Sequence, residues 1–303
     1  MTLETQLPSP NQLWAHSTCC LKDLCAATND IRITAIEADI LMGHDLTHPG
    51  SKCPIMAHPP DTTSDLSFET FINHVIASKR CQHVKLDFKD IESVDHVLHT
   101  LSMVESKLSS TQTIFLNADI LPGPGKRNAN LQVPGNEFLG KCLKFISNQK
   151  RKNQYAFSLG FMVDCRSMTG YSHQDIKVLQ DVIINNYLIE KSKGVVLAVN
   201  ARVLCKRLDV FDKILNDFPQ LQILVWTATG EPPISKIRIE KIRNHFSKTG
   251  MSANVGFDCL VAKSHITGFF FDWAVWIVSI FWNLKQIAVS ISTLPKIKKY
   301  KRN

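Results

Sequence analysis

Two acidic residues at alternate positions, Glu37 and Asp39, interrupt the largely apolar segment Ile33–Leu41. Because the side chains of a β-strand alternate between its two faces, Ile36, Ala38 and Ile40 line one face and Glu37 and Asp39 project from the other. Two carboxylates on a buried face need a nearby cation, since burial of an unpaired charge is costly. The pattern therefore predicts a buried strand with a polar site on one face.

Two later segments, Val84–Phe88 and Ile114–Leu121, show the same alternation. Each places aliphatic residues on one face and polar residues on the other. The polar positions in and just after these segments are Lys85, Asp87, Lys89, Asn117 and Asp119. Three successive strands of this kind indicate one polar site where the strands end.

Strand-like and helix-like segments alternate along the chain. Strands are predicted over residues 13–18, 33–41, 83–88, 113–121, 155–162, 194–199, 222–227 and 253–260. Helices are predicted over residues 21–28, 67–78, 91–108, 137–148, 173–190, 208–217 and 235–248, with Ser67 and Ser235 as N-caps and Gly250 as a stop. Eight such units with right-handed crossovers predict a parallel (β/α)8 TIM barrel. An open doubly wound sheet is the alternative, but no GxGxxG motif follows the first strand.

Charge and cysteine content narrow the class of protein. The 303 residues carry a formal net charge of +8, and a short C-terminal run contributes five of the positive charges. These residues are Lys296, Lys298, Lys299, Lys301 and Arg302. The rest of the chain is mildly basic and shows no interleaving of basic and aromatic residues, which argues against nucleic-acid binding. Nine cysteines without a CxxC pair indicate reduced thiols, and residues 1–12 show no secretory signal, so a cytoplasmic location is favoured over a single-pass membrane protein.

The C-terminal segment 263–303 is set apart from a barrel of residues 1–262 by its composition. Ile266–Trp282 is mainly aromatic and aliphatic, and residues 269–289 are long enough to span a membrane, so membrane contact through residues 266–289 is one interpretation. The other interpretation is the eighth barrel helix, followed by a basic tail. On such a helix Phe270, Trp273, Ile277 and Ile280 share one face, and we expect this stripe to pack on the sheet.

Seven short blocks, in order along the chain, carry a family resemblance. They are Trp14-Ala-His16, Ile36-Glu-Ala-Asp-Ile40, Met56-Ala-His-Pro-Pro60, Lys85-Leu-Asp-Phe-Lys89, Asn117-Ala-Asp-Ile-Leu-Pro-Gly-Pro124, Ser158-Leu-Gly160 and Trp226-Thr227. The chain resembles the menorin family, animal proteins linked to neuronal patterning and maintenance. That family in turn is similar to the phospholipase-C-like and glycerophosphodiester phosphodiesterase TIM barrels, through the order His, Glu-x-Asp, His and an acid two residues before a Lys.

The resemblance implies roles for individual residues. His16 and His58 match the two histidines that act as general acid and base. Glu37, Asp39 and Asp87 match the carboxylates that hold one divalent cation, and oxygen ligands suit Mg²⁺ or Ca²⁺. Lys89, Asn117 and Arg202 follow as candidates to contact a phosphate, with Lys89 neutralising one of its oxygens. Alternatively, Glu37 and Asp39 pair internally with Lys85, Lys89 or Arg202, and Asn117 binds the loop that begins at Pro122.

Two functions from different classes follow. The first is a metal-dependent phosphoric diester hydrolase or lyase that acts on a small phosphodiester or a phospholipid head group. The second is a catalytically silent barrel that serves as a protein-interaction module in neuronal or epithelial patterning and maintenance. Whether the three carboxylates bind a cation separates the two.

Overall fold

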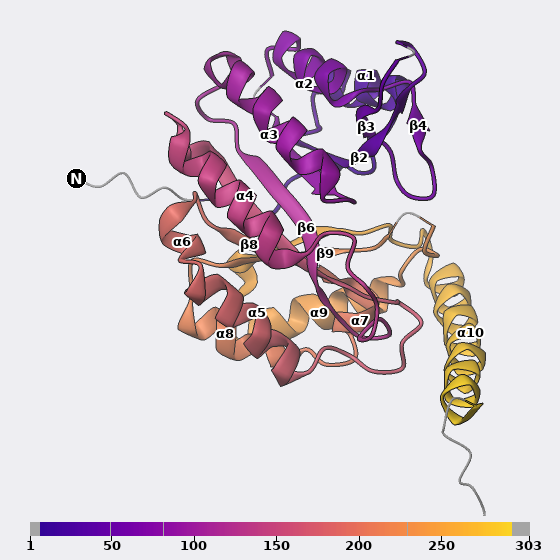
Figure 1. Ribbon diagram of the computed structural model, residues 1–303. Helices are drawn as coiled ribbons and strands as arrows, with labels where there is room; N and C mark the ends of the chain where they lie inside the picture. The colour runs from indigo at the N-terminus through magenta and orange to yellow at the C-terminus, as the bar shows by residue number, and fades with distance from the viewer. Residues whose placement is uncertain (1–6, 49, 81, 229, 293–303) are drawn as a thin grey trace, which may run out of the picture.

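The computed structural model describes residues 7–48, 50–80, 82–228 and 230–292 (Figure 1). Its strands are β1 (Trp14–Ala15), β2 (Ala35–Asp45), β3 (Cys53–Met56), β4 (Thr63–Ser64), β5 (His83–Phe88), β6 (Ile114–Pro122), β7 (Tyr155–Met162), β8 (Val195–Asn200), β9 (Gln222–Trp226) and β10 (Val255–Asp258). Its α-helices are α1 (Leu21–Asn29), α2 (Phe68–Ala77), α3 (Glu92–Val104), α4 (Gly135–Asn148), α5 (His173–Asn185), α6 (Leu188–Lys191), α7 (Ala201–Leu204), α8 (Asp212–Asp217), α9 (Lys236–Lys248) and α10 (His265–Ser292).

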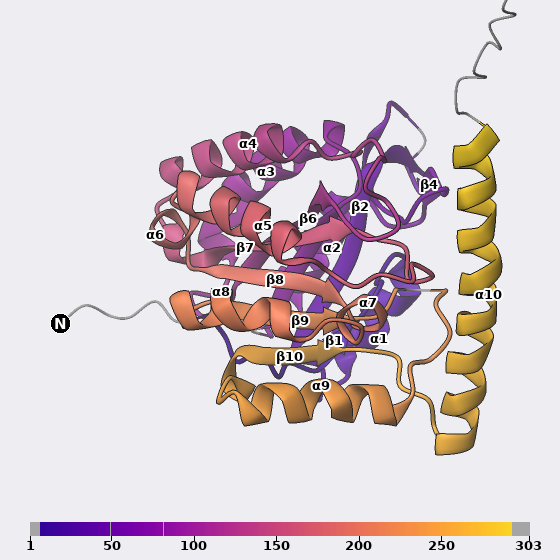
Figure 2. The same cartoon turned by 90° about the horizontal axis from the view of Figure 1, so that it is seen from below.

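Eight of these strands form a parallel sheet in the order β1-β2-β5-β6-β7-β8-β9-β10. Helices from the crossovers flank this sheet in both views (Figures 1 and 2). All eight predicted strands are present, and the predicted α/β barrel fold is confirmed. Their order follows the chain, as in a TIM barrel.

The barrel is nearly closed. Among the described residues, no backbone ladder joins β10 to β1. The first strand has only two residues, and the chain just before it runs against β10, where a Cβ added to Gly256 would lie 1.9 Å from the Pro10 carbonyl oxygen. The predicted closed sheet is therefore completed at this seam by side chains and by the N-terminal segment.

Two short strands were not predicted. β2 continues to Asp45, four residues beyond its predicted end, and pairs with β3 in an antiparallel ladder and with β4 in a parallel one. Gly43 permits this pairing, because a Cβ there would lie 2.4 Å from the Ile55 side chain. The hairpin brings His58, two residues after β3, to the end of the barrel where β2 ends.

The apolar face of each inner strand packs beneath the helices. Ile36, Ala38 and Ile40 of β2 are fully buried, and the aliphatic residues of β5 and β6 belong to the same core. Ser67 and Ser235 accept backbone hydrogen bonds as N-caps of α2 and α9, as predicted. The predicted alternation therefore directs the acidic face of β2 into the barrel.

The C-terminal helix α10 lies beside the barrel, on the side toward which the strand arrows of β8, β9 and β10 point (Figure 2). It approaches α9 closely, since a Cβ at Gly268 would lie 2.9 Å from the Ser235 Cβ. The expectation that Phe270 and Trp273 pack on the sheet is wrong, because these side chains are 60% and 52% exposed. The predicted basic tail, residues 296–302, lies outside the described residues.

No helix within the described residues has both the length and the apolar character that crossing a membrane requires.

Candidate functional site

A pocket opens at the carboxyl ends of the barrel strands, with a volume of about 620 Å³ including its mouth. It is lined by His16, Glu37, Asp39, His58, Lys85, Asp87, Lys89, Asn117, Asp119, Ala198, Trp226 and Ala228. The structure thus brings seven of the eight candidate residues to one place, and Arg202 is the exception.

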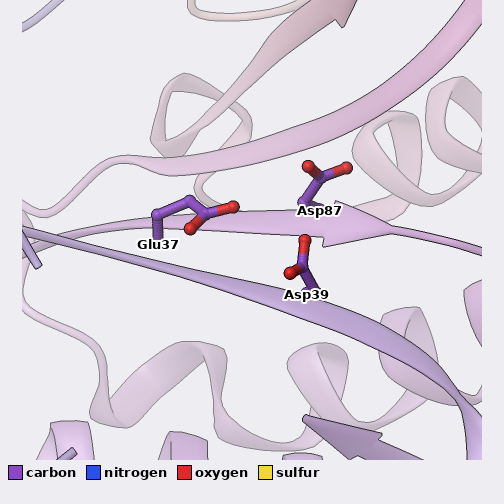
Figure 3. A group of neighbouring side chains, drawn as sticks. All are labelled: Glu37, Asp39 and Asp87. Carbon is purple, nitrogen blue, oxygen red and sulfur yellow. The ribbon is translucent and has the colours of Figure 1, made fainter. Parts of the chain in front are cut away.

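Three carboxylates converge in this pocket. Each of Glu37, Asp39 and Asp87 offers an oxygen, and these oxygens lie within 4.8 Å of one another (Figure 3). The parallel register of β2 and β5 sets Asp39 beside Asp87, and Glu37 lies two residues earlier on the inward face of β2. A cluster of carboxylate oxygens is the donor set that Mg²⁺ and Ca²⁺ prefer, so the residues present fit a hard divalent cation.

Glu37 is the most enclosed member of the cluster, with 2% of its surface exposed. Its Oε2 accepts a 2.6 Å hydrogen bond from the Ser17 backbone amide, which a left-handed conformation at Ser17 (φ 54°) directs inward. Burial, followed by the negative charge of Asp39, raises the pKa of Glu37. The cluster is therefore short of positive charge.

Lys89 is the cation that the chain supplies. Its Nζ lies 2.8 Å from Asp39 Oδ1 and 2.7 Å from Asp87 Oδ2. Burial opposes its charge, but Asp87 and Asp39 outweigh that effect and raise the pKa of Lys89 well above its ordinary value. The predicted internal pairing thus occurs through Lys89, while Lys85 lies 4.0 Å from Asp258.

His16 follows the first strand and is held by two acids. Its Nδ1 lies 2.8 Å from Asp258 Oδ2 and 3.4 Å from Glu37 Oε2. Burial alone would lower the pKa of His16, yet the hydrogen bond to Asp258 and the charge of Glu37 raise it from 6.5 to about 9. His16 is therefore protonated at neutral pH, with Nε2–H as its remaining donor.

His58 has different surroundings. It is exposed at the pocket rim, and its Nδ1 lies 2.6 Å from the Pro59 carbonyl oxygen. A carbonyl oxygen only accepts, so Nδ1 carries the proton in this contact. In the neutral form of His58, Nε2 is therefore the acceptor.

The far wall of the pocket carries polar atoms without protein partners. Among the described residues, Asn117 Oδ1 and Trp226 Nε1 are buried and accept or donate no hydrogen bond. Asp119 is next to Gly160 on the neighbouring strand, where a Cβ would lie 2.4 Å from Asp119 Oδ1, so glycine makes room for this carboxylate. Burial, followed by the charge of Asp87, raises the pKa of Asp119 from 3.8 to about 7.

The structure does not bring Arg202 to the pocket. This residue lies in the first turn of α7 with 2% of its surface exposed. It donates to Asp272 Oδ1 of α10 at 2.8 Å and to the Pro232 carbonyl oxygen at 2.7 Å. Helix α7 begins immediately after β8, and this turn carries Arg202 toward α9 and α10.

Sequence reasoning did not single out Asp258, the residue that holds His16. The available signal was its place as an acid near the end of the last predicted strand, where barrel strands direct their functional residues. Lys85 and Asp119 were predicted at the polar site without a catalytic or metal-binding role, and Trp226 was noted only in a family block. All three line the pocket.

The fold and this pocket define an α/β barrel with an acidic cluster and two histidines at its mouth. The family model described as the Menorin N-terminal domain matches residues 11–256. Protein FAM151B from Homo sapiens is 30% identical over 247 residues, which cover 79% of this chain and 80% of that protein. The chain therefore belongs to the menorin family, as its seven blocks predicted.

Among solved structures, the chain is similar to 3-keto-D-glucoside 4-epimerase, YcjR, from E. coli in its apo form. That likeness has a TM-score of 0.37 and 12% sequence identity, and it covers 71% of this chain and 84% of that chain.

Proposed function

We propose that the pocket binds a divalent cation through Glu37, Asp39 and Asp87 and that it acts on a phosphodiester as a hydrolase or lyase. The observation that carries this proposal is the convergence of the three carboxylates within 4.8 Å, in the pocket that His16 and His58 also line. Four carboxylates line this pocket against two lysines and the protonated His16, so negative charge is in excess when all four are ionised, and a divalent cation would offset it. Mg²⁺ and Ca²⁺ have that charge and prefer oxygen ligands.

The two histidines are prepared for opposite proton transfers. His58 has a free acceptor nitrogen and is suited to remove a proton from an attacking hydroxyl group. His16, protonated because Asp258 and Glu37 stabilise its charge, is suited to return a proton to the leaving oxygen. Reversal of the two roles would require His16 to lose a proton that both acids favour.

The remaining polar groups are suited to hold the substrate. Asn117 Oδ1 accepts from a hydroxyl or amine of the ligand, and Trp226 Nε1 donates to one of its oxygens, which would satisfy both buried atoms. Lys89 would neutralise a phosphate oxygen once the bound cation takes over its partners Asp39 and Asp87. When bound, the cation would supply stabilisation of negative charge on the phosphoryl oxygens.

A second candidate function is a silent barrel that binds other proteins. One observation favours it: Lys89 already pairs with two of the three carboxylates, as in a permanent internal ion-pair network. In that case neither Mg²⁺ nor Ca²⁺ binds, and the pocket is part of the scaffold.

Calorimetric titration with Mg²⁺ and with Ca²⁺ separates the two functions. We expect saturable binding to the metal-free protein and a loss of more than about a hundredfold in affinity for Glu37→Gln, because removal of a ligand exceeds the usual effect of changing an outer-shell partner. Glu69→Gln, the same change at an exposed position of α2, is the matched control and should bind as the unchanged protein does. Absence of saturable binding with both ions would leave the silent barrel as the function.

Activity is tested on bis(4-nitrophenyl) phosphate, a chromogenic phosphodiester, with and without the ion that binds. Release of nitrophenol that depends on the ion and is lost in Glu37→Gln is the expected result. Binding of the ion without any turnover would retain the cation site and reject the hydrolase.

A further inference from the structure

Helix α10 carries its large apolar side chains on the side that faces away from the barrel. Gly268 and Ser279 are buried and Asp272 is largely covered, whereas Ile266 is 71% exposed and Phe281 is 68% exposed. The exposed side chains, here called the apolar face, are those of Ile266, Phe269, Phe270, Trp273, Trp276 and Phe281. A surface helix ordinarily turns its apolar stripe toward the core, so the orientation of α10 is inverted.

Two ion pairs fix this orientation. Asp272 accepts from Arg202 Nη1 and from Arg238 Nε, each at 2.8 Å. Arg202 is buried, and a buried guanidinium without its acid would be strongly destabilising. Because Asp272 must point at the barrel, the residues on the opposite side of the helix must point away from it.

The two ion pairs of Asp272 also set the position of α10 relative to the pocket. Arg202 lies two residues after the end of β8, and Arg238 lies in the first turn of α9. Both therefore lie at the carboxyl ends of the strands, where the pocket opens, and Figure 2 shows α10 on that side of the molecule. The apolar face is thus presented beside the mouth of the barrel.

We propose that the apolar face docks on the surface of an anionic lipid bilayer. Between Ile266 and Phe281 the only ionised residue is Asp272, which faces inward, so the face lacks the polar rim of a transient protein interface. Its tryptophans suit the boundary between head groups and hydrocarbon, where such rings concentrate.

The sequence around the helix has the charge that such a surface attracts. Lys263 precedes α10, and Lys296, Lys298, Lys299, Lys301 and Arg302 follow it within a short stretch. Basic residues next to a membrane-bound segment are attracted to negatively charged lipids. Binding by this face concerns the helix alone and does not depend on chemistry at the three carboxylates.

Co-sedimentation of the full-length protein with vesicles tests the proposal. One set of vesicles contains phosphatidylcholine and phosphatidylserine, and the other contains phosphatidylcholine alone. We expect binding to the first set, weaker binding to the second, and weakening by high salt. In the double variant Phe270→Ser with Trp273→Ser, affinity for the anionic vesicles should fall roughly a hundredfold, about tenfold for each aromatic side chain removed from lipid.

The matched control is the double variant Ile31→Ser with Met103→Ser, whose side chains are 86% and 60% exposed on other parts of the surface. It should bind vesicles as the unchanged protein does, and circular dichroism should show that both variants are folded. Equal binding by the Phe270/Trp273 variant, or no binding by the unchanged protein, would overturn the proposal. A stable dimer that does not bind vesicles and dissociates in that variant would identify a second copy as the occupant instead. Cation titration is unchanged in every one of these outcomes, so this test is separate from that of the catalytic site.

Discussion

His16 Nδ1 and Asp258 Oδ2 lie 2.8 Å apart although 242 positions separate these residues in the chain. His16 follows β1 and Asp258 ends β10, the two strands that no backbone ladder joins among the described residues. One side-chain contact thus links the first and last strands of the barrel and also sets the protonation of a histidine in the pocket. The contact between the first and last strands and the protonation of His16 therefore depend on the same pair, His16 and Asp258.

The first prediction concerns the titration of His16. Replacing Asp258 with Asn removes the hydrogen bond that most favours the protonated imidazole, so the pKa of His16 should fall from about 9 toward its ordinary value of 6.5. NMR titration of the His16 ring in the metal-free protein measures this value. An unchanged titration midpoint in Asp258→Asn would show that Glu37 alone holds the proton.

The same pair should make stability depend on pH. Because the pKa of His16 is raised on folding, its contribution is fully present below pH 6.5 and is lost as the pH rises through about 9. We expect the unfolding free energy of the unchanged protein, relative to Asp258→Asn, to fall by on the order of 2 kcal/mol across that interval. Asp181→Asn, which removes an exposed acid from α5, should show no such dependence in chemical denaturation.

The second prediction concerns Asp39. Replacing Asp39 with Asn removes a ligand, so cation binding should be lost in calorimetric titration. The metal-free protein should be as stable as the unchanged chain or more stable, because one of several repelling carboxylates is neutralised while Lys89 keeps Asp87 as its partner. A variant that unfolds without metal, or that binds the ion with full affinity, would contradict this assignment.

The third prediction concerns Lys89, which competes with a cation for Asp39 and Asp87. Lys89→Gln should raise cation affinity by about tenfold, because the ion no longer has to displace an ammonium group. The metal-free variant should be destabilised in thermal denaturation, since Asp39 and Asp87 lose the ammonium group that pairs with both. Lys141→Gln, which removes a lysine paired with surface acids, is the control for both measurements. Unchanged affinity in Lys89→Gln would mean that the ion binds without displacing Lys89.

The fourth prediction concerns His58. Its replacement with Ala should lower turnover of bis(4-nitrophenyl) phosphate by about 10²- to 10⁴-fold, the usual contribution of a general base. Cation affinity should not change, because His58 is bound to Pro59 rather than to the carboxylates. Turnover at the full rate in this variant would remove His58 from the mechanism.

The sequence predicted the centre of the site because parallel strands bring their carboxyl ends to one face. The alternation in β2 and β5 was sufficient to place Glu37, Asp39 and Asp87 together. The order of the remaining blocks added His16 and His58. Strand period and strand order thus placed the three carboxylates, whereas the two histidines came from the family resemblance.

Other features depended on contacts that no local pattern encodes. Asp258 is the last residue of the short strand β10, which shows no polar alternation, so its place near a strand end was the one available signal. Arg202 was expected at a strand end, but Asn200 caps α7, and this turn carries the arginine away from the pocket. Strands β3 and β4 are too short for a period to be detected.

For the C-terminal helix, the sequence pattern predicted the helix but not the direction of its apolar side. Its apolar composition correctly predicted a helix that contacts the barrel. The assumption that the apolar stripe faces inward was wrong, because Asp272 binds two arginines and turns that stripe outward. The two ion pairs of Asp272 outweighed the amphipathic pattern of residues 266–281.

The last prediction tests whether the ion pair between Asp272 and Arg202 stabilises the barrel. Replacing Asp272 with Ala leaves Arg202, which is 2% exposed, without its closest acid, since Glu231 is 3.5 Å away. We expect the unfolding free energy to fall by about 3 kcal/mol, as for other buried pairs that lose one partner. Asp217→Ala, which breaks a surface pair with Lys213, should cost less than about 1 kcal/mol in the same urea titration.

Truncation after residue 262 removes Asp272 with the whole helix and should yield aggregated or unfolded protein. A truncated chain that is soluble and as stable as the full chain would show that α10 and the ion pairs of Asp272 do not stabilise the barrel.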